Sequence, residues 1–258
     1  CGIIGRVHAR GWLGVEGQPT EIAALADTNP DAQKEYGDFF GVGEEHCYGD
    51  YREMLDKEQP DFVDVCSWHQ MHAEMVIAAA ARGPKAILCQ KPMAVDLREA
   101  DDMLTACARN NVKLIIAYQR PHHAVWLRAR ELVREGVIGK ISQVQMACGG
   151  NLLNTNSHNI RLALFMMDEP EVEWVVGAVE RTTELVERGL PAEDACMGVA
   201  GCANGASILI MGNLVGGLGQ GCRIIGSEGI MELSTDRLPD SEVPSAAPMY
   251  MPEGPSAR

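Results

Sequence analysis

The chain has 258 residues, of which 46% are hydrophobic and 22% charged, a composition typical of a globular protein long enough for two domains. Its formal net charge of −14 argues against nucleic acid or an anionic membrane as a partner. Nine cysteines are scattered without a C-x-x-C pair, a pattern that favours reduced thiols in a cytoplasmic protein, and no apolar run approaches the roughly 18–20 residues of a transmembrane helix.

A glycine pair opens the chain, in the segment Cys1-Gly2-Ile3-Ile4-Gly5. Gly2 and Gly5 have the spacing of the last two glycines of G-x-G-x-x-G, so the first glycine and its strand would lie before residue 1. A helix over residues 6–13 would point its N-terminus at bound phosphates. We therefore expect Gly2, Ile3, Ile4 and Gly5 to bind a dinucleotide, although a simple tight turn would explain two glycines equally well.

An acidic residue ends the next predicted strand, residues 21–26, and this residue is Asp27. A carboxylate about 20 positions beyond the glycines is the expected partner of an adenosine ribose hydroxyl. It would repel a 2′-phosphate, so NAD is favoured over NADP. The alternative is turn chemistry, because Asp27 precedes Asn29-Pro30, a good helix start.

Strands and helices then alternate as far as residue 120. Helices are predicted at 29–40, 51–57, 73–82 and 97–110, and strands at 62–66, 86–89 and 112–118. This alternation predicts a doubly wound parallel sheet in an α/β domain over residues 1–120. Polar side chains follow each strand, where such sheets bind ligands. Those expected to contact the cofactor are Asp27, Ser67, Trp68, His69, His72, Gln90, Lys91 and Gln119.

Lys91 stands where the apolar strand 86–89 ends, because Pro92 lacks the amide hydrogen that a central strand needs. A lysine has a lowered pKa when it is desolvated or lies beside another positive charge, such as an oxidised nicotinamide ring. Lys91 is therefore a candidate catalytic residue. The alternative is a solvated lysine in a loop.

The pattern changes near residue 121. Helices are predicted at 124–135 and 158–167, and strands at 141–147, 172–179, 197–202, 206–211 and 222–233, with hairpin signals at Asn204-Gly205 and Glu228-Gly229. We expect a second α/β domain over residues 121–258 with a large, open, mainly antiparallel sheet. Five prolines in residues 239–258 predict an extended or poorly packed tail.

Four motifs in this order resemble the Gfo/Idh/MocA family: C-G-x-I-G-R-x-H at the start, Ser67-x-x-x-x-His72, Gln90-Lys91-Pro92 and Asn154-x-x-x-His158. The resemblance implies a nicotinamide-dependent oxidoreductase with an N-terminal Rossmann domain. It implies sugars, inositols or related polyols as substrates. It also implies a C-terminal domain that carries the substrate site and often forms the oligomer contact, so we expect a dimer or tetramer through the second sheet.

The motifs depart from the family pattern at the acidic positions. The family's E-K-P is here Gln90-Lys91-Pro92, and its D-x-x-x-H is Asn154-x-x-x-His158. Further departures are Trp68 for a proline, Asn156 for a glycine and Arg161 for an aspartate. The chain is also short for the family before residue 1 and between Met146 and Gly149, and residues missing there would explain this.

By this resemblance, a hydride passes between a carbinol carbon and the nicotinamide ring. Lys91 would polarise or deprotonate the hydroxyl, His158 would act as general base, and the Asn154 amide would orient the histidine or the sugar. We expect Lys91 and His158, from two domains, to converge over the ring. The alternative for His158 is a helix-start residue beside capping groups. No histidine spacing is typical of zinc, so no metal is predicted.

Two other functions stay open at this stage. The loss of two carboxylates would suit a protein that binds a dinucleotide and a sugar as a regulator, without turnover. A third hypothesis is transient use of the cofactor for elimination or glycoside cleavage through a keto intermediate.

Overall fold

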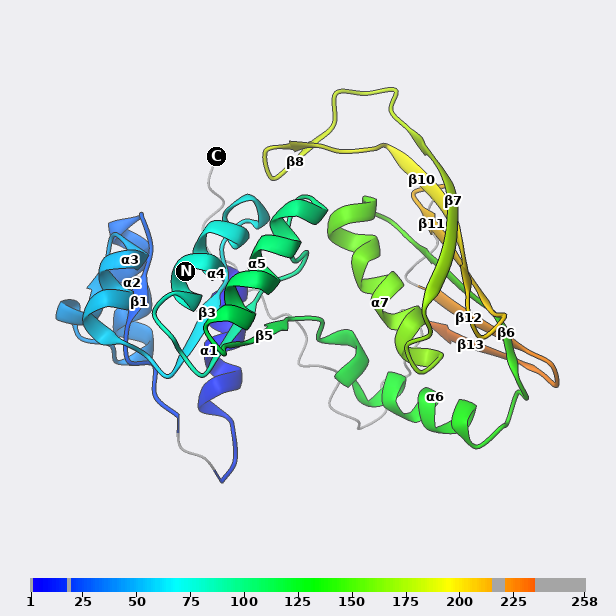
Figure 1. The fold of residues 1–258 in the computed structure, drawn as a ribbon, viewed down its shortest axis with the longest axis horizontal. Coiled ribbons are helices and arrows are strands. Elements are labelled where there is room, and N and C mark those ends of the chain that lie inside the picture. Colours follow the sequence, from blue (N-terminus) through cyan, green and yellow to red (C-terminus); the bar gives the residue numbers. More distant parts are fainter. Residues whose placement is uncertain (1, 18–19, 215–220, 235–258) are drawn as a thin grey trace. The chain divides into compact units, whose positions relative to one another are not determined.

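The computed structural model describes residues 2–17, 20–214 and 221–234, which fall into two compact units, Cys1–Tyr118 and Gln119–Arg258 (Figure 1). The predicted boundary lay two residues later, after residue 120. No helix within the described ranges has the length and apolar character needed to cross a membrane. The proline-rich tail, 239–258, lies outside the described residues.

The helices of the first unit match the predicted ones to within two residues at each end, except that α1 begins three residues before its predicted start. They are α1 (Ile3–Leu13), α2 (Pro30–Phe40), α3 (Tyr51–Glu58), α4 (His72–Ala80) and α5 (Leu97–Arg109), with short 3-10 turns η1 (Glu44–His46) and η2 (His69–Met71). The Asn29 side chain caps α2 by accepting from the Asp31 amide at 3.0 Å. Asp96 caps α5 by accepting from the Glu99 amide at 2.8 Å.

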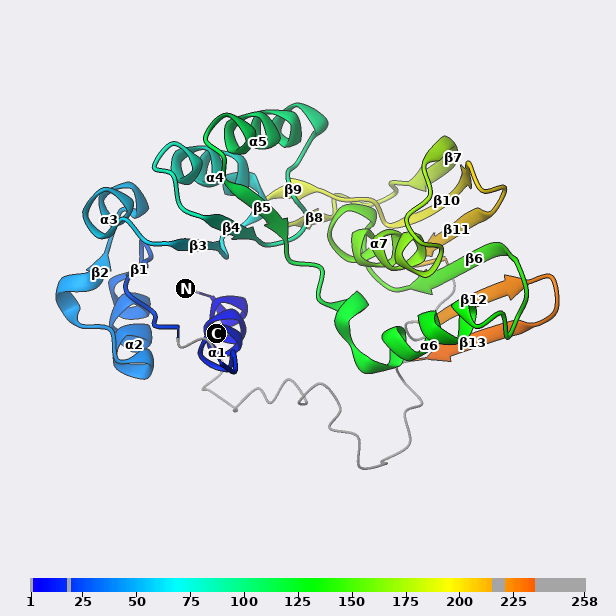
Figure 2. The ribbon, with the colours of Figure 1, turned by 60° about the horizontal axis from the view of Figure 1, so that its bottom comes forward.

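Parallel strands form the centre of the first unit, which confirms the predicted fold class. The strands β3 (Phe62–Val65), β4 (Ala86–Cys89) and β5 (Lys113–Ile116) pair in that order, and β1 (Leu25–Ala26) pairs with β2 (Cys47–Tyr48). Val63 and Val65 belong to the core that these strands form with α4 and α5. Both helices lie on the same side of the strands (Figure 2). Asp64, between these two valines, points to the opposite face, where α1 lies.

The strand predicted over residues 21–26 is wrong in length, since only Leu25–Ala26 is strand. Its partner β2 is itself two residues long, so the ladder cannot extend further among the described residues. β2 was not predicted, because two residues show no periodicity.

The second unit is a six-stranded mixed sheet with two helices on one face (Figures 1 and 2). Its strands are β6 (Ile141–Cys148), β7 (Val172–Glu180), β10 (Ala195–Cys202), β11 (Ser207–Gly212), β12 (Gly221–Gly226) and β13 (Ile230–Ser234), in the order β13-β12-β6-β11-β10-β7. Only the β6–β11 pair among them is parallel, so the sheet is mainly antiparallel, as expected.

Helices α6 (Ala124–Arg134) and α7 (Ser157–Met166) bury the inner face of this sheet. Leu162 and Met166 of α7 are almost fully buried, against Val144 of β6 and Ile208 of β11. The alternating burial along β6 and β11 is the pattern of a sheet covered on one face.

Strand β7 lies at the sheet's edge and is exposed along its whole length. Val175 and Val176 are 71% and 63% exposed, and they point to opposite faces because neighbouring strand residues alternate. Long, exposed apolar edge strands are uncommon in isolated chains, since they offer unpaired backbone groups for association.

Short elements escaped prediction in the second unit as well. A ribbon of β8 (Val186–Glu187) and β9 (Leu190–Pro191) joins β7 to β10. A 3-10 turn η3 (Arg120–His122) precedes α6, and a π-helical turn η4 (Leu152–Asn156) leads directly into α7.

Candidate functional site

Helix α1 begins at Ile3, directly after Gly2, as a phosphate-binding helix would. Gly2 has no side chain to cap the helix, and a Cβ there would meet no described atom within 4 Å, so the space beside the first turn is open. A Cβ on Gly5 would lie 3.8 Å from Cβ of Cys66, an ordinary contact. Close helix packing therefore does not by itself require glycine at position 5.

Asp27 follows β1 and also makes the predicted turn. Its amide donates to the Tyr48 carbonyl at 3.0 Å, and its carboxylate Oδ1 accepts from the Asn29 amide at 2.9 Å. The Gln33 side chain donates to the Asp27 carbonyl at 2.7 Å. The turn chemistry is thus observed, and it holds the Asp27 carboxylate at the end of the strand. The binding of a ribose by this carboxylate remains a prediction.

His72 ties the loop after β3 to the loop after β4. Its ring is almost fully buried; Nδ1 lies 2.8 Å from the Pro92 carbonyl oxygen and Nε2 lies 3.1 Å from the Ser67 carbonyl oxygen. A neutral imidazole has one N–H and donates to only one of these oxygens at a time. Because both nitrogens face the protein backbone, His72 supports the position of Lys91-Pro92.

The other residues predicted to contact the cofactor differ in exposure. Trp68 is 61% exposed, whereas His69 is buried. Gln119 is exposed and stands before η3, in the second unit. Their cofactor roles, and that of Ser67, stay predictions.

Gln90 directs its amide toward α1. Its Nε2 lies 2.6 Å from Nε2 of His8, and its Oε1 accepts from the Lys91 amide at 3.3 Å. Gln90 is buried, and Lys91 is half-buried at the end of β4. The residue that replaces the family's acid is therefore engaged with the first helix as well as with the lysine backbone.

Asp64 anchors this hydrogen-bonded chain. It accepts from His8 Nδ1 at 2.9 Å, from Trp12 Nε1 at 2.9 Å and from Cys66 Sγ at 3.3 Å. With Nδ1–H given to Asp64, Nε2 of a neutral His8 ring is an acceptor for the Gln90 amide. The contacts run from Asp64 through His8 and Gln90 to the Lys91 amide. Sequence analysis missed Asp64, although a charge inside an apolar strand was a usable signal.

His8, Asp64 and Cys66 also place three possible metal-ligand atoms within 4.8 Å of one another. The prediction of no metal considered only spacing along the chain, so it overlooked this cluster. Metal binding needs a thiolate. Burial, together with the Asp64 carboxylate, raises the pKa of the Cys66 thiol. The cluster as it stands is explained by its own hydrogen bonds.

In the second unit, His158 lies at the start of α7 and is buried. Gly150, whose φ of +96° suits only glycine, turns the chain from β6 toward η4. Asn156 then donates to the Gly150 carbonyl at 3.0 Å and accepts from Asn159 at 3.1 Å. These buried amides explain why the turn before His158 is rich in asparagine.

Arg120 joins this network from η3. Its Nη1 donates to Oδ1 of Asn159 at 2.7 Å, and burial lowers the pKa of its guanidinium from the ordinary value. Neither Arg120 nor Asn159 was among the site residues predicted from the sequence.

Two carboxylates from the segment around β8 and β9 reach the same turn. Glu187 accepts from the side-chain amides of both Asn151 and Asn154, and Glu193 accepts from the Leu152 backbone amide. Neither glutamate was predicted. Lys91 and His158 belong to different units, and their convergence over one nicotinamide ring stays a prediction.

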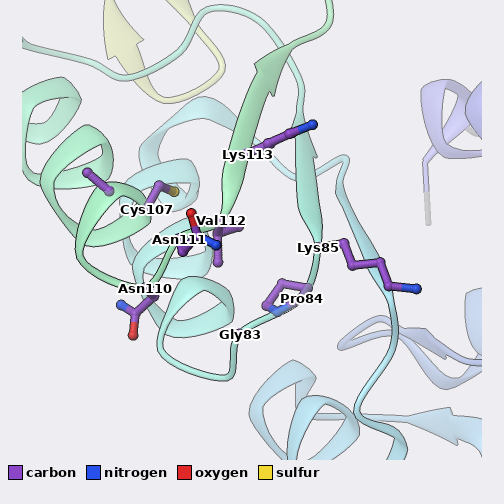
Figure 3. Close-up of a pocket in the computed structure, with 9 residues that line it drawn as sticks. Gly83, Pro84, Lys85, Cys107, Asn110, Asn111, Val112 and Lys113 are labelled. Carbon is purple, nitrogen blue, oxygen red and sulfur yellow. The ribbon is translucent and has the colours of Figure 1, made fainter.

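A separate pocket of about 470 Å³ lies at the opposite ends of the parallel strands (Figure 3). It is lined by Gly83, Pro84 and Lys85, which directly precede β4, and by the end of α5 and the start of β5. Ligands of open α/β sheets bind outside the carboxyl ends of the strands, where Lys91 stands. We therefore do not assign the cofactor to this pocket.

Comparisons with known proteins agree with the fold. Residues 1–118 match the family model GFO_IDH_MocA, described as an oxidoreductase family with an NAD-binding Rossmann fold. The D-apiose dehydrogenase of Paraburkholderia graminis is 38% identical over 140 residues, which cover 54% of this chain and 36% of that protein. The myo-inositol 2-dehydrogenase of Thermotoga maritima is 28% identical over 188 residues, which cover 67% and 54% respectively.

Among solved structures, a probable dehydrogenase from Thermotoga maritima superposes with a TM-score of 0.75 at 25% identity, covering 90% of this chain and 73% of that one. The match to the two curated relatives spans 36% and 54% of their lengths, so about a third to a half of each. The Rossmann unit and these matches support a member of the Gfo/Idh/MocA oxidoreductase family, with the family model matching residues 1–118.

Proposed function

We propose that this chain is an NAD-dependent dehydrogenase that transfers a hydride between the cofactor and a carbinol carbon of a sugar, inositol or related polyol. The observation that carries the proposal is Lys91 at the carboxyl end of β4, in a Rossmann unit that matches an NAD-binding oxidoreductase family. Its relatives include a D-apiose and a myo-inositol dehydrogenase, which supports a sugar or polyol as substrate.

The residues of the first unit fit a dinucleotide. The open space at Gly2 admits a pyrophosphate to the N-terminus of α1, and Asp27 presents a carboxylate for a ribose. That carboxylate would repel a 2′-phosphate, which favours NAD over NADP. When bound, the cofactor supplies the hydride acceptor.

The protein's own part in the reaction is to align the substrate and move its proton. Lys91 holds the reacting oxygen, its loop fixed by His72 and Gln90. His158, the general base, takes the proton, because an imidazole titrates near neutral pH. Asn154 cannot accept a proton, so it serves orientation alone.

We also infer a homo-oligomer and a cytoplasmic location. The exposed valines of edge strand β7 support self-association through the second sheet. All the described cysteines are free thiols, which supports a reducing compartment.

Substitution of Lys91 tests the function directly. The change Lys91→Ala should lower kcat about 10²- to 10⁴-fold on the polyol that the wild type oxidises, while NAD affinity in titration stays unchanged. Lys85→Ala is the matched control, because Lys85 stands at the other end of the same strand and pairs with Asp61 on the surface.

A panel of sugars, inositols and other polyols, followed by the absorbance of the reduced cofactor, distinguishes the functions. NAD binding without turnover over the panel would point to a regulator, and product without net cofactor reduction would point to elimination or glycoside cleavage. Wild-type turnover by Lys91→Ala would refute the lysine's role.

A further inference from the structure

The turn that leads into α7 contains no acidic residue of its own. From Asn151 to Asn159 its side chains are apolar, amide, hydroxyl or imidazole. A general base that takes up a proton becomes an imidazolium, and a carboxylate partner stabilises and orients that cation. The asparagine four residues before His158 cannot do this, because an amide carries no charge.

The fold brings a carboxylate to that turn from elsewhere in the chain. Glu187, the last residue of β8, accepts from Nδ2 of Asn154 and from Nδ2 of Asn151. Glu187 is half-buried and Asn151 is buried. Both amides donate, so the carboxylate is held in a fixed position by two hydrogen bonds of the charge-assisted kind.

Asn151 makes this position a rigid one. Its Oδ1 accepts from the Asn154 amide at 2.9 Å, and its carbonyl accepts from the Thr155 and Asn156 amides at 3.2 Å and 3.0 Å. A single residue therefore caps the turn and also holds Glu187. The carboxylate is fixed to the same backbone that carries His158 into α7.

A purely structural role is the competing explanation, because a carboxylate near a helix N-terminus stabilises the helix. Glu193 shows that role clearly, since it accepts from the Leu152 backbone amide. Glu187 differs, because the contacts seen for it are with side-chain amides, one of them from Asn154.

We propose that Glu187 is a positioning residue of the active site. It supplies the carboxylate that position 154 lacks, and it acts on the proposed base His158 by way of the turn that contains Asn154. This inference rests on the proposed function. Activity should require one negative charge on the pair of positions 154 and 187, and either position can carry it.

An exchange of the two groups tests this requirement. In Glu187→Gln the charge is lost, and kcat should fall about tenfold or more, with a smaller change in KM. In Asn154→Asp two carboxylates face each other, and activity should also fall because the like charges repel. The double variant, Asn154→Asp with Glu187→Gln, restores one carboxylate and one amide donor, and kcat should return to within about threefold of the wild type.

Two controls separate a catalytic effect from a folding effect. Glu184→Gln removes an exposed carboxylate from the same segment, so kcat should remain that of the wild type. Thermal unfolding followed by circular dichroism checks that each variant is folded, and a variant that melts below the assay temperature is assayed at a lower temperature together with the wild type.

The outcomes are distinct. Recovery of kcat in the double variant supports the inference. An active wild type whose kcat is unaffected by Glu187→Gln, or whose double variant is no better than the worse single variant, would overturn it while leaving the dehydrogenase function intact. A wild type that turns over no polyol in the panel would overturn both.

Discussion

Removal of the Asp64 carboxylate should destabilise the first unit far more than removal of a nearby surface carboxylate. Asp64 is the common acceptor for His8, Trp12 and Cys66, and its side chain is 21% exposed. The change Asp64→Ala leaves two N–H donors, from an imidazole and an indole, without their acceptor. It also removes the hydrogen bond that orients the His8 ring, on which the contact between His8 and Gln90 depends.

The expected loss follows from those donors. A buried donor left without a partner costs about 1–3 kcal/mol, and the Cys66 thiol is too weak a donor to add much. Two N–H groups, discounted for the water that can reach a partly exposed site, amount to about 2–4 kcal/mol of unfolding free energy. The shape of the site is also lost, so activity should fall along with stability.

Urea unfolding of the full chain measures this difference. Tryptophan fluorescence is a suitable probe because Trp12 donates to Asp64. The matched control is Asp61→Ala, which removes a carboxylate that is 67% exposed and pairs with Lys85 on the surface. Such a pair contributes about 0–1 kcal/mol.

The two variants should therefore differ by at least about 1 kcal/mol in the transition that the fluorescence reports. Equal midpoints and slopes for Asp64→Ala and Asp61→Ala would refute the reasoning, because they would show that the buried hydrogen-bonded chain contributes no more than an exposed ion pair.

Two further predictions concern the lysine loop and the second core. Gln90→Glu places a carboxylate beside Lys91 and should raise the pKa of that amine, so the limb of the pH–rate profile that Lys91 controls should move to higher pH. An unchanged profile would contradict the effect. Leu162→Ala should lower the free energy of unfolding by about 2–5 kcal/mol, since Leu162 is fully buried in the second core, whereas Leu127→Ala, at a 42% exposed position, should cost less than about 1 kcal/mol in the same urea titration.

Local patterns predicted most helices and strands to within one or two residues. The strand at 86–89 is observed as β4 with the same bounds, because an apolar run ends there at a proline. The helix predicted at 29–40 is α2, since Asn29 caps it and Pro30 suits its first turn. These signals act between residues close in sequence, so they can be read without the fold.

The failures fall where an element depends on a distant partner. The strand predicted over residues 21–26 reduces to Leu25–Ala26 because its neighbour β2 is short. The ribbon of β8 and β9 was missed because two-residue strands have no periodicity. A strand exists only where another strand pairs with it, and sequence pattern alone does not show how long that partner is.

Residue patterns alone predicted the resemblance to the family, the parallel sheet, the glycine turn and the positions of Lys91 and His158 along the chain. The fold alone brings carboxylates from distant positions to these segments: Asp64 meets His8 across 56 positions, and Glu187 meets Asn154 across 33. Hydrogen bonds between side chains distant in sequence impose no period and no spacing on the residues, so only the folded chain reveals them.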